Sequence, residues 1–324
     1  MNYKIAFVGL GSIATRHLKN VAAYLSNRGD TYSIDLYRSQ MRPLPEELAV
    51  LVKEVFLYAE ELPAERQYDV VFVTNPTSLH YETLEKFCKN TKSFFIEKPV
   101  FDSTCVDESI FTKLKGIKSY VACPLRYNAV LQYVKNNVNL DQVYSARAIS
   151  SSYLPDWRPG QDYRNTYSAH KELGGGVAID LIHEWDYLTW LFETPQTCYT
   201  IQTKVSNLEI NSEDVALYIA RTDKRLIELH LDYYGRESIR LLQLFMPDDT
   251  IECDILGGTI HYLKTGKEVK VESERNAFQM KEIEHFFEII NNKTDNDSTP
   301  EHAFRVLKIA KGELLDEDSY YNLR

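Results

Sequence analysis

The sequence contains little cysteine, and its cysteines are not grouped. Five occur in 324 residues, and no two of them form a C-x-x-C pair. Scattered, unpaired cysteines are typical of a reducing compartment, and their spacing excludes a cysteine-rich zinc site. The chain also lacks the roughly twenty consecutive apolar residues of a membrane span and the apolar region of a secretion signal. We therefore expect a cytoplasmic protein, and no pattern predicts a metal site.

Positive charge is also scarce. Lysine and arginine number 37 against 47 acidic residues, which gives a formal net charge of -10. Proteins that bind nucleic acid or an anionic membrane normally carry a cluster of basic residues. The sequence has no such cluster, so we expect neither partner. A hydrophobic fraction of 44% and a charged fraction of 26% are ordinary for a folded chain.

The first part of the chain alternates short apolar runs with longer amphipathic stretches. This order predicts βαβ units around a parallel sheet that is covered on both faces, and so an α/β fold. We expect residues 1–123 to form a doubly wound domain of this kind. The expected strands and helices are Lys4–Val8, Ile13–Leu25, Ser33–Tyr37, Asp69–Val73, Ser78–Cys88, Ser93–Ile96 and Ser119–Ala122.

The pattern changes after residue 123. The alternating runs that follow predict a second, α+β domain over residues 124–324, built on a large, mostly antiparallel open sheet. Two domains also suit the length, because single cores stop growing at about 250–300 residues. The expected elements are a helix at Asn128–Asn136, a strand at Gln142–Leu154, a helix at Val177–Phe192, strands within Thr197–Val271, and helices at Gln279–Asn291 and Pro300–Leu315, the last capped by Thr299.

Two of the few glycines lie directly after the first expected strand, in Gly9-Leu10-Gly11-Ser12-Ile13-Ala14. This G-x-G-x-x-A pattern opens a helix, and the free amide groups at such a helix start bind a pyrophosphate. A tight turn in another α/β domain is the alternative. The context favours a dinucleotide held by Gly9, Gly11, Ser12 and Ile13, so we expect residues 1–123 to be a dinucleotide-binding Rossmann domain.

The end of the second expected strand bears on the choice between NAD and NADP. An acidic residue there binds the free ribose hydroxyl of NAD, whereas arginine accepts the 2′-phosphate of NADP. Asp35 lies inside the expected strand, and Arg38 and Ser39 follow it. This placement favours NADP over NAD. The alternative is that Arg38 is a solvated arginine in a loop, with no role in cofactor binding.

A lysine follows another expected strand, in Phe95-Ile96-Glu97-Lys98-Pro99. Ligands bind at the carboxyl ends of strands in open α/β sheets, so the Lys98 ammonium could hydrogen-bond a substrate oxygen and polarise it. The tripeptide by itself is equally compatible with a surface lysine in a turn.

Several motifs follow one another along the chain. They are the glycine turn, Thr74-Asn75-Pro76-Thr77-Ser78-Leu79-His80, Glu97-Lys98-Pro99, Leu125-Arg126-Tyr127-Asn128, and Gly174-Gly175-Gly176 followed by Asp180 and His183. Together they resemble the glucose–fructose oxidoreductase, inositol dehydrogenase and MocA family, Gfo/Idh/MocA, of NAD(P)-dependent oxidoreductases. The resemblance implies hydride transfer between nicotinamide and a hydroxyl or keto carbon of a sugar, sugar derivative or cyclic polyol. It further implies cofactor contacts from Thr74, Asn75, Pro76, His80, Glu97 and Lys98, and a homodimer or homotetramer formed through the open sheet of the second domain.

Asp180 and His183 make chemical sense together. Three residues apart in one expected helix, they would share a face. His183 could exchange a proton with a substrate hydroxyl near neutral pH, while Asp180 orients His183 or Lys98. Family members usually place the histidine four residues after the aspartate. Glu184 and Asp186 are expected on the solvated side of the helix or at a subunit contact.

A loop rich in aromatic and basic residues lies between the long strand and the glycine triplet. Aromatic rings stack on sugars, and arginine pairs with carboxylate or phosphate. We expect substrate contacts, of a kind that suits an anionic sugar, from Trp157, Arg158, Tyr163 and Arg164 in this loop and from Arg126 earlier in the chain. A surface loop in which Trp157 only covers apolar area is the alternative.

Two other functions remain open within the resemblance. Some relatives cleave glycosidic bonds by transient oxidation with a tightly held NAD, and others are non-catalytic ligand sensors. The joint presence of Lys98, Asp180 and His183 favours catalysis over sensing.

Overall fold

The computed structural model describes residues 1–272 and 274–313, and it divides the chain into two compact units. Of the described residues, the first contains Met1–Ala122 and Gln279–Phe304, and the second contains Cys123–Phe278 and residues 305–313. The expected division placed every residue from 124 onward in the second domain, so the return of Gln279–Phe304 to the first unit was not anticipated. No helix in the described part of the chain is long and apolar enough to cross a membrane.

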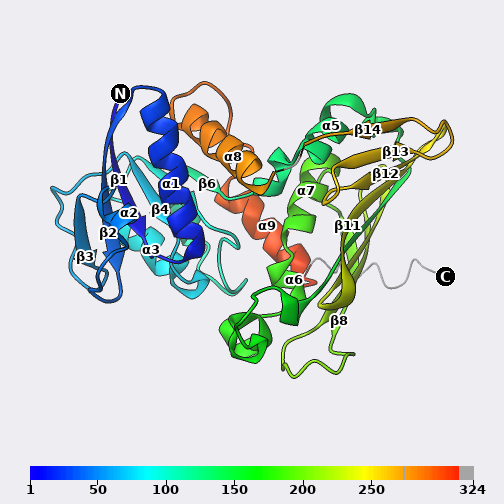
Figure 1. Cartoon of the computed structure of the whole chain (residues 1–324), viewed down its shortest axis with the longest axis horizontal. Helices are drawn as coiled ribbons and strands as arrows, with labels where there is room; N and C mark the ends of the chain where they lie inside the picture. The colour runs from blue at the N-terminus through cyan, green and yellow to red at the C-terminus, as the bar shows by residue number, and fades with distance from the viewer. Residues whose placement is uncertain (273, 314–324) are drawn as a thin grey trace. The chain divides into compact units, whose positions relative to one another are not determined.

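The first unit contains a six-stranded parallel sheet with the order β3-β2-β1-β4-β5-β6 (Figure 1). Successive crossovers run outward on both sides of β1, which is the doubly wound Rossmann arrangement. All residues of β4 and β5 are buried, as expected for parallel strands covered on both faces. The strands are β1 (Asn2–Val8), β2 (Thr31–Arg38), β3 (Glu54–Leu57), β4 (Val70–Val73), β5 (Ser93–Ile96) and β6 (Lys118–Val121); the edge strand β3 was not predicted.

Helices pack on both faces of this sheet. On one face, α1 (Ser12–Asn27) lies beside α8 (Arg275–Ile290), and the rings of Tyr24 and Phe287 are 5.2 Å apart (Figure 1). Phe286 of α8 packs against Phe95 of β5, with ring centroids 5.2 Å apart. This aromatic burial is the physical reason that α8 belongs to the first unit. The remaining helices are α2 (Glu46–Ala49), α3 (His80–Phe87) and α4 (Ser109–Leu114).

The second unit contains an eight-stranded sheet with the order β14-β13-β12-β11-β7-β10-β9-β8. Only the β7–β10 pair is parallel, so the predicted fold class is confirmed for both sheets. The strands are β7 (Ser145–Tyr153), β8 (Thr197–Thr203), β9 (Val215–Arg221), β10 (Leu226–Asp232), β11 (Tyr234–Phe245), β12 (Thr250–Asp254), β13 (Thr259–Tyr262) and β14 (Glu268–Lys270).

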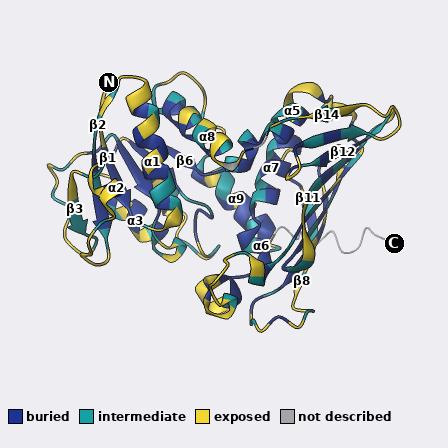
Figure 2. Ribbon diagram, in the orientation of Figure 1, coloured by how far each residue is buried: buried dark blue, intermediate teal, exposed yellow. Residues whose placement is uncertain are grey.

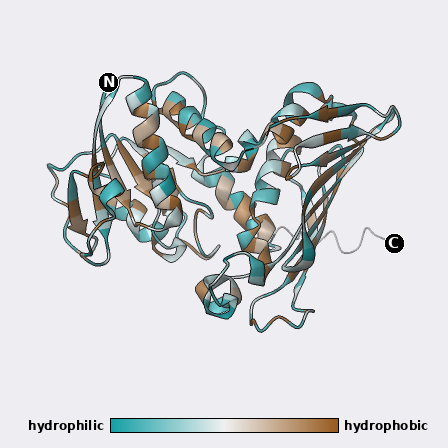
Figure 3. Cartoon of the chain, in the orientation of Figure 1, coloured by the Kyte–Doolittle hydropathy of each residue, from teal (hydrophilic) through white to brown (hydrophobic). Residues whose placement is uncertain are grey.

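The large sheet is covered on one face. Helices α6 (Val177–Asp180) and α7 (His183–Phe192) pack there, and the Trp185 ring meets the Tyr218 ring edge-on at 5.3 Å. The opposite face carries exposed apolar side chains, among them Ile201, Leu217 and Ile219. Burial therefore alternates along β9. In Figures 2 and 3, the strands of the large sheet carry residues of differing exposure and hydropathy.

Two further helices complete the described chain. They are α5 (Ala129–Asn137) and α9 (Pro300–Ala310). The Thr299 hydroxyl accepts a hydrogen bond from the His302 amide at 3.2 Å, which confirms the predicted cap of α9. The helix was expected to reach Leu315, and residues 314 and 315 lie outside the described residues.

Asp232 fixes the turn from β10 into β11. Its buried carboxylate accepts hydrogen bonds from the Ser151 hydroxyl at 3.0 Å, the Tyr234 amide at 3.0 Å and the Gly235 amide at 2.7 Å, and it pairs with His230. Burial alone would raise the pKa of Asp232, but these partners outweigh it and the pKa is lowered.

We expect Asp232→Ala to lower the free energy of unfolding of the second unit by about 3 kcal/mol, because several buried donors lose their acceptor. Urea unfolding followed by circular dichroism measures the change.

The stabilising effect of Asp232 also depends on pH. Because its folded pKa is depressed, the effect is full above the unfolded pKa of about 3.9 and is lost as the pH falls through the lower folded value. Glu228→Ala, on the exposed side of the same strand, is the control and should change little. An equal effect of the two substitutions would contradict the role given to Asp232.

Candidate functional site

The glycine turn after β1 depends on a close approach of two backbones. Gly9 has a φ of 96°, and its amide donates to the Tyr37 carbonyl at 2.9 Å. A Cβ atom at Gly9 would lie 2.6 Å from the Asn75 Cα atom, which real contacts do not allow. Glycine is therefore required here on both conformational and steric grounds.

Gly11 has a different role from Gly9. It is the N-cap of the sixteen-residue helix α1 and has an extended backbone, with φ -97° and ψ -171°. No side chain caps the helix, and a Cβ atom at Gly11 would meet nothing within 4 Å. The first amides of α1, from Ser12 and Ile13, therefore receive no side-chain cap. An uncapped helix start with this space fits a dinucleotide pyrophosphate.

The Thr74–His80 segment forms the next part of this sheet edge. The Thr74 hydroxyl donates to the Val8 carbonyl at 3.0 Å, and the Asn75 side-chain amide donates to the Thr83 hydroxyl at 2.8 Å. The Asn75 side-chain oxygen is buried and has no hydrogen-bond partner among the described residues. Its side chain therefore retains an acceptor that a ligand could use.

His80 lies within this segment as a buried brace. Its two ring nitrogens lie 3.2 Å from the Val100 carbonyl and 3.1 Å from the Asn75 carbonyl. Burial lowers the pKa of His80, although both carbonyls oppose this shift. The predicted cofactor residue thus holds two backbone segments together, and Pro76 lies exposed between Asn75 and His80.

The end of β2 separates the acidic and basic candidates for cofactor choice. Asp35 accepts a hydrogen bond from the Tyr68 hydroxyl at 2.9 Å, and burial raises the pKa of its carboxyl group. Arg38 is the last residue of β2, and its guanidinium donates to the Arg42 carbonyl at 2.7 Å. The exposed Ser39 follows. Arg38 and Ser39 therefore lie at the carboxyl edge of the sheet, and Asp35 lies within the strand.

Lys98 follows β5 at the same edge of the sheet, as expected. Strand β5 ends at Ile96, and the Glu97 amide still pairs with the Val73 carbonyl at 2.9 Å. The Glu97 carboxylate accepts a hydrogen bond from the Lys98 amide at 3.2 Å and another from the His17 ring. Sequence reasoning missed His17, although a histidine on the apolar face of α1 was a visible signal.

In the second unit, the glycine triplet precedes two short helices. A Cβ atom at Gly175 would lie 2.0 Å from the Tyr167 carbonyl oxygen, so this position also requires glycine. The prediction of one helix over Val177–Phe192 is wrong, because α6 ends at Asp180 and α7 begins at His183. Leu181 leaves the helical conformation, with φ -98° and ψ 27°. The two side chains therefore do not share the face of one continuous helix.

Asp180 is surrounded by tyrosines that sequence reasoning missed. The buried Tyr233 hydroxyl donates to the Asp180 carboxylate at 2.5 Å. Burial raises the pKa of both Tyr233 and Tyr167, and the charge of Asp180 raises it further. Both phenols therefore stay protonated at neutral pH and can act as donors. Tyrosines are frequent throughout the chain, so no sequence signal distinguished these two.

Glu184 of α7 is buried and Asp186 is half-buried, which contradicts the expectation that they face solvent or a subunit contact. Glu184 is 0% exposed and accepts a hydrogen bond from Arg240 at 2.6 Å. Asp186 binds Arg126 through two hydrogen bonds, at 2.6 and 2.9 Å. Arg126, predicted to contact substrate, is itself only 1% exposed. Each buried charge therefore has a partner of opposite sign.

The aromatic and basic loop after β7 is held by its own contacts. The Trp157 indole donates to the Ser152 hydroxyl at 2.9 Å, and its ring meets the Tyr233 ring edge-on at 5.2 Å. The Arg158 guanidinium lies 5.7 Å from the centre of the Tyr167 ring. Arg164 is exposed and pairs with Asp162 and Glu209. Trp157 and Arg158 are thus the two loop residues whose contacts lead to the tyrosines around Asp180.

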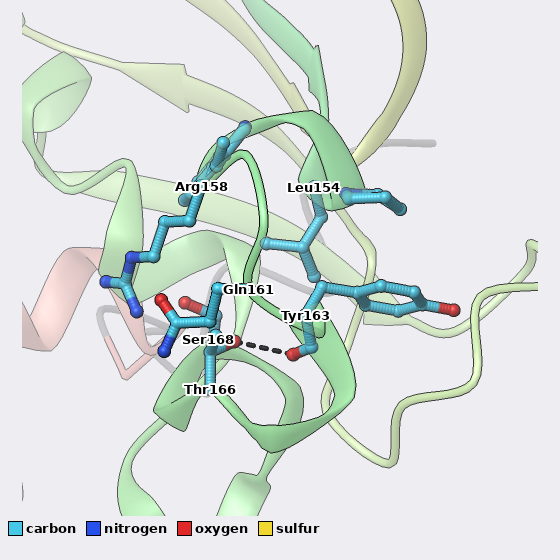
Figure 4. A pocket seen from close by; sticks show the side chains of 8 residues that line it. Leu154, Arg158, Gln161, Tyr163, Thr166 and Ser168 are labelled. Atoms are coloured by element: carbon cyan, nitrogen blue, oxygen red, sulfur yellow. Dashed lines mark hydrogen bonds between the residues drawn. The ribbon is translucent and has the colours of Figure 1, made fainter.

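The loop also encloses a small cavity, shown in Figure 4 with the side chains of Arg158 and Tyr163. Its volume of about 10 Å³ holds about one water molecule, so it is too small for a sugar ring. The Tyr163 hydroxyl accepts a hydrogen bond from the Glu209 amide at 3.2 Å. Within the described residues, no group of three histidine, cysteine or acidic side chains is placed to hold a metal ion.

Comparison with known proteins agrees with this geometry. Residues 3–110 match the model of the GFO_IDH_MocA family, described as an oxidoreductase family with an NAD-binding Rossmann fold. An uncharacterized oxidoreductase of Synechocystis is 22% identical over 322 residues, which cover 98% of this chain and 78% of the relative.

Solved structures of dehydrogenases share the fold of almost the whole chain. The WlbA dehydrogenase of Bordetella pertussis, in complex with NADH and UDP-GlcNAcA, has a TM-score of 0.76 at 15% identity and covers 97% of both chains. A levoglucosan dehydrogenase with NADH and levoglucosan has a TM-score of 0.79 at 12% identity, over 97% of this chain and 96% of the other. The myo-inositol 2-dehydrogenase of Lactobacillus plantarum has a TM-score of 0.76 at 16% identity, with the same coverage.

The resemblance seen in the motifs is therefore confirmed for residues 3–110, which match the Gfo/Idh/MocA oxidoreductase family and its NAD-binding Rossmann fold.

Proposed function

We propose that the protein is a dehydrogenase that transfers hydride between NAD(P) and a hydroxyl or keto carbon of a sugar, sugar derivative or cyclic polyol. The observation that carries this proposal is the position of Lys98. Lys98 follows β5 at the carboxyl edge of the six-stranded sheet. The glycine turn follows β1 at this same edge, and Asn75 follows β4 there. In parallel α/β sheets, cofactor and substrate bind at this edge.

The cofactor side of the proposal uses residues of the first unit. The amides of Ser12 and Ile13 at the start of α1 bind the pyrophosphate, and Gly9 and Gly11 give it access. Thr74, Asn75, Pro76 and Glu97 lie along the remaining edge, with His80 behind them. When bound, the nicotinamide supplies the hydride acceptor or donor.

The contrast between Asp35 and Arg38 supports NADP over NAD. Asp35 is engaged by Tyr68 within the strand, so it does not extend from the strand end toward a ribose hydroxyl. Arg38 and Ser39 lie at the strand end, where a guanidinium and a hydroxyl can bind a 2′-phosphate.

The substrate side of the proposal assigns one role to each of three residues. Lys98 hydrogen-bonds and polarises the reacting oxygen, His183 exchanges the proton of that oxygen, and Asp180 orients the neighbouring donors. Solved relatives carry UDP-GlcNAcA and levoglucosan, which supports a carbohydrate substrate. Arg158 and its loop supply the positive charge for an anionic sugar.

We further propose that the exposed face of the eight-stranded sheet binds a second copy of the chain, in a homodimer or homotetramer. Exposed Ile201, Leu217 and Ile219 give this face an apolar surface that association would bury. All five cysteines are free, which suits a reducing compartment such as the cytoplasm.

Binding of NADPH and NADH to purified protein is the first test, followed by a panel of sugars and polyols assayed by nicotinamide absorbance. We expect NADPH to bind more tightly, and Arg38→Ala to weaken NADPH by about tenfold while leaving NADH almost unchanged. Arg28→Ala, an exposed arginine at the other end of the unit, should change neither constant. Absence of saturable binding of both cofactors to folded protein would overturn the proposed function.

Gly11→Val separates cofactor binding from folding. The extended backbone and the empty space at Gly11 accept a β-branched side chain, so we expect the melting temperature to stay within a few degrees. The new side chain fills the space assigned to the pyrophosphate and should weaken NADPH by about a hundredfold or more. Fluorescence titration and calorimetry measure the two effects. If Gly11→Val kept its affinity for NADPH, the pyrophosphate would have to bind elsewhere.

Lys98→Ala should lower kcat by about a hundredfold or more, because the reacting oxygen loses its charged donor. Lys92→Ala is the matched control, since Lys92 immediately precedes the same strand and forms an exposed pair with Asp69. Steady-state assays on any sugar that turns over with wild type provide the measurement. Full turnover by Lys98→Ala would remove Lys98 from the mechanism without affecting the cofactor site.

A further inference from the structure

A buried polar pair, formed by His17 and Glu97, joins α1 to the segment that follows β5 and contains Lys98. His17 lies on the face of α1 that packs against the sheet and is 1% exposed. Its ring centroid lies 4.9 Å from that of Phe95 on β5, at an angle of 64°. The Nε2 atom contacts one carboxylate oxygen of Glu97, and because a carboxylate only accepts hydrogen bonds, Nε2 carries the proton.

Glu97 also binds the backbone of Lys98. Its second carboxylate oxygen accepts the Lys98 amide at 3.2 Å, and its own amide pairs with the Val73 carbonyl of β4 at 2.9 Å. The two oxygens of one carboxylate therefore hold a helix side chain and the backbone of the next residue. The backbone of Lys98 is therefore held in place by Glu97, which is itself anchored to α1 and β4.

The charge of Glu97 keeps this arrangement intact. Burial alone would raise the pKa of its carboxyl group, but the hydrogen bond and charge of His17, together with the charge of Lys98, lower it instead. Glu97 is therefore a carboxylate at neutral pH and can accept both hydrogen bonds. On the other side of the ring, His17 Nδ1 is buried with no hydrogen-bond partner among the described residues. The ring is consequently held by Glu97 and by aromatic packing.

The position of the pair distinguishes it from an ordinary core contact. An apolar side chain at position 17 would fill the space between α1 and β5 without the desolvation cost of a buried histidine and carboxylate. At one end of the pair, His17 belongs to α1, the helix that begins directly after the glycine turn. At the other end it is attached to Lys98. These are the two elements that must keep a fixed register if hydride transfer is to be efficient.

We propose that His17 is a positioning residue for the dehydrogenase reaction: it holds the Glu97 carboxylate so that Lys98 keeps a fixed place relative to the dinucleotide-binding helix. This inference rests on the proposed function. It assigns His17 no contact with substrate or cofactor, and its effect passes through Glu97.

The test is a double-mutant cycle on the full chain. His17→Leu removes the donor and retains apolar bulk, and Glu97→Gln retains size but replaces the charge. The double variant combines both changes, and His17→Gln restores a donor near the Nε2 position. Val21→Ala, one helical turn along the buried face of α1, is the control for lost packing. The measurements are NADPH dissociation constants, kcat and KM, and hydrogen exchange of the peptide spanning residues 93–101.

We expect His17→Leu to lower kcat by about 10- to 100-fold with a small change in the sugar KM, because misplacement of a catalytic group affects the reaction more than binding. Exchange at residues 93–101 should accelerate in His17→Leu, and His17→Gln should restore much of both properties. If His17 acts through Glu97, the double variant should resemble the single variants, since their effects are not independent.

Three results would overturn the inference. They are additive effects of His17→Leu and Glu97→Gln, equal effects of Val21→Ala and His17→Leu on kcat and exchange, and unchanged kcat in a folded His17→Leu variant. Failure of the proposed function has a different signature, because wild-type protein itself would then bind neither NADPH nor NADH. That result would remove the reaction that His17 is proposed to serve.

Discussion

The backbone contact between Gly9 and Asn75 is the constraint on which the first unit depends. Strands β1 and β4 are neighbours in the sheet, and their ends can approach this closely only because position 9 lacks a side chain. The approach directs the chain into α1 with its first amides uncovered. It also places the Thr74–Asn75 segment beside the turn, so that one steric requirement shapes two sides of the proposed cofactor site.

Below this contact, aromatic side chains determine how the elements stack. Phe72 of β4 packs against Phe7 at 4.4 Å and against Phe95 at 4.9 Å, which extends one aromatic row across three strands. Helix α8 closes that row with Phe286, and the His17 ring lies against it from α1. The polar pair formed by His17 and Glu97 is thus set in an apolar layer, where a carboxylate needs its charged and hydrogen-bonded neighbours.

The sequence was sufficient to predict features that depend on local chemistry. Continuous apolar runs identified β1, β2, β4, β5 and β6, and the glycine turn identified the start of α1. It was not sufficient where the outcome depends on distant partners. The solvated positions expected for Glu184 and Asp186 were wrong because Arg240 and Arg126, far away in the chain, pair with them. The break between Asp180 and His183 was missed because Leu181 and Ile182 continue a helical apolar pattern. The roles assigned to Lys98, His183 and the loop residues remain predictions.

The order of strands in the chain has a consequence for how the protein folds during synthesis. The parallel pair at the centre of the large sheet joins segments 81 residues apart, as the Arg147–Glu228 contact shows. The aromatic layer of the first unit acquires Phe286 only after the entire large sheet has been synthesised. An emerging chain therefore exposes the unfinished aromatic layer of its first unit until α8 leaves the ribosome. Such late closure of an N-terminal core makes chaperone binding during translation advantageous, because exposed apolar surface on incomplete chains promotes aggregation.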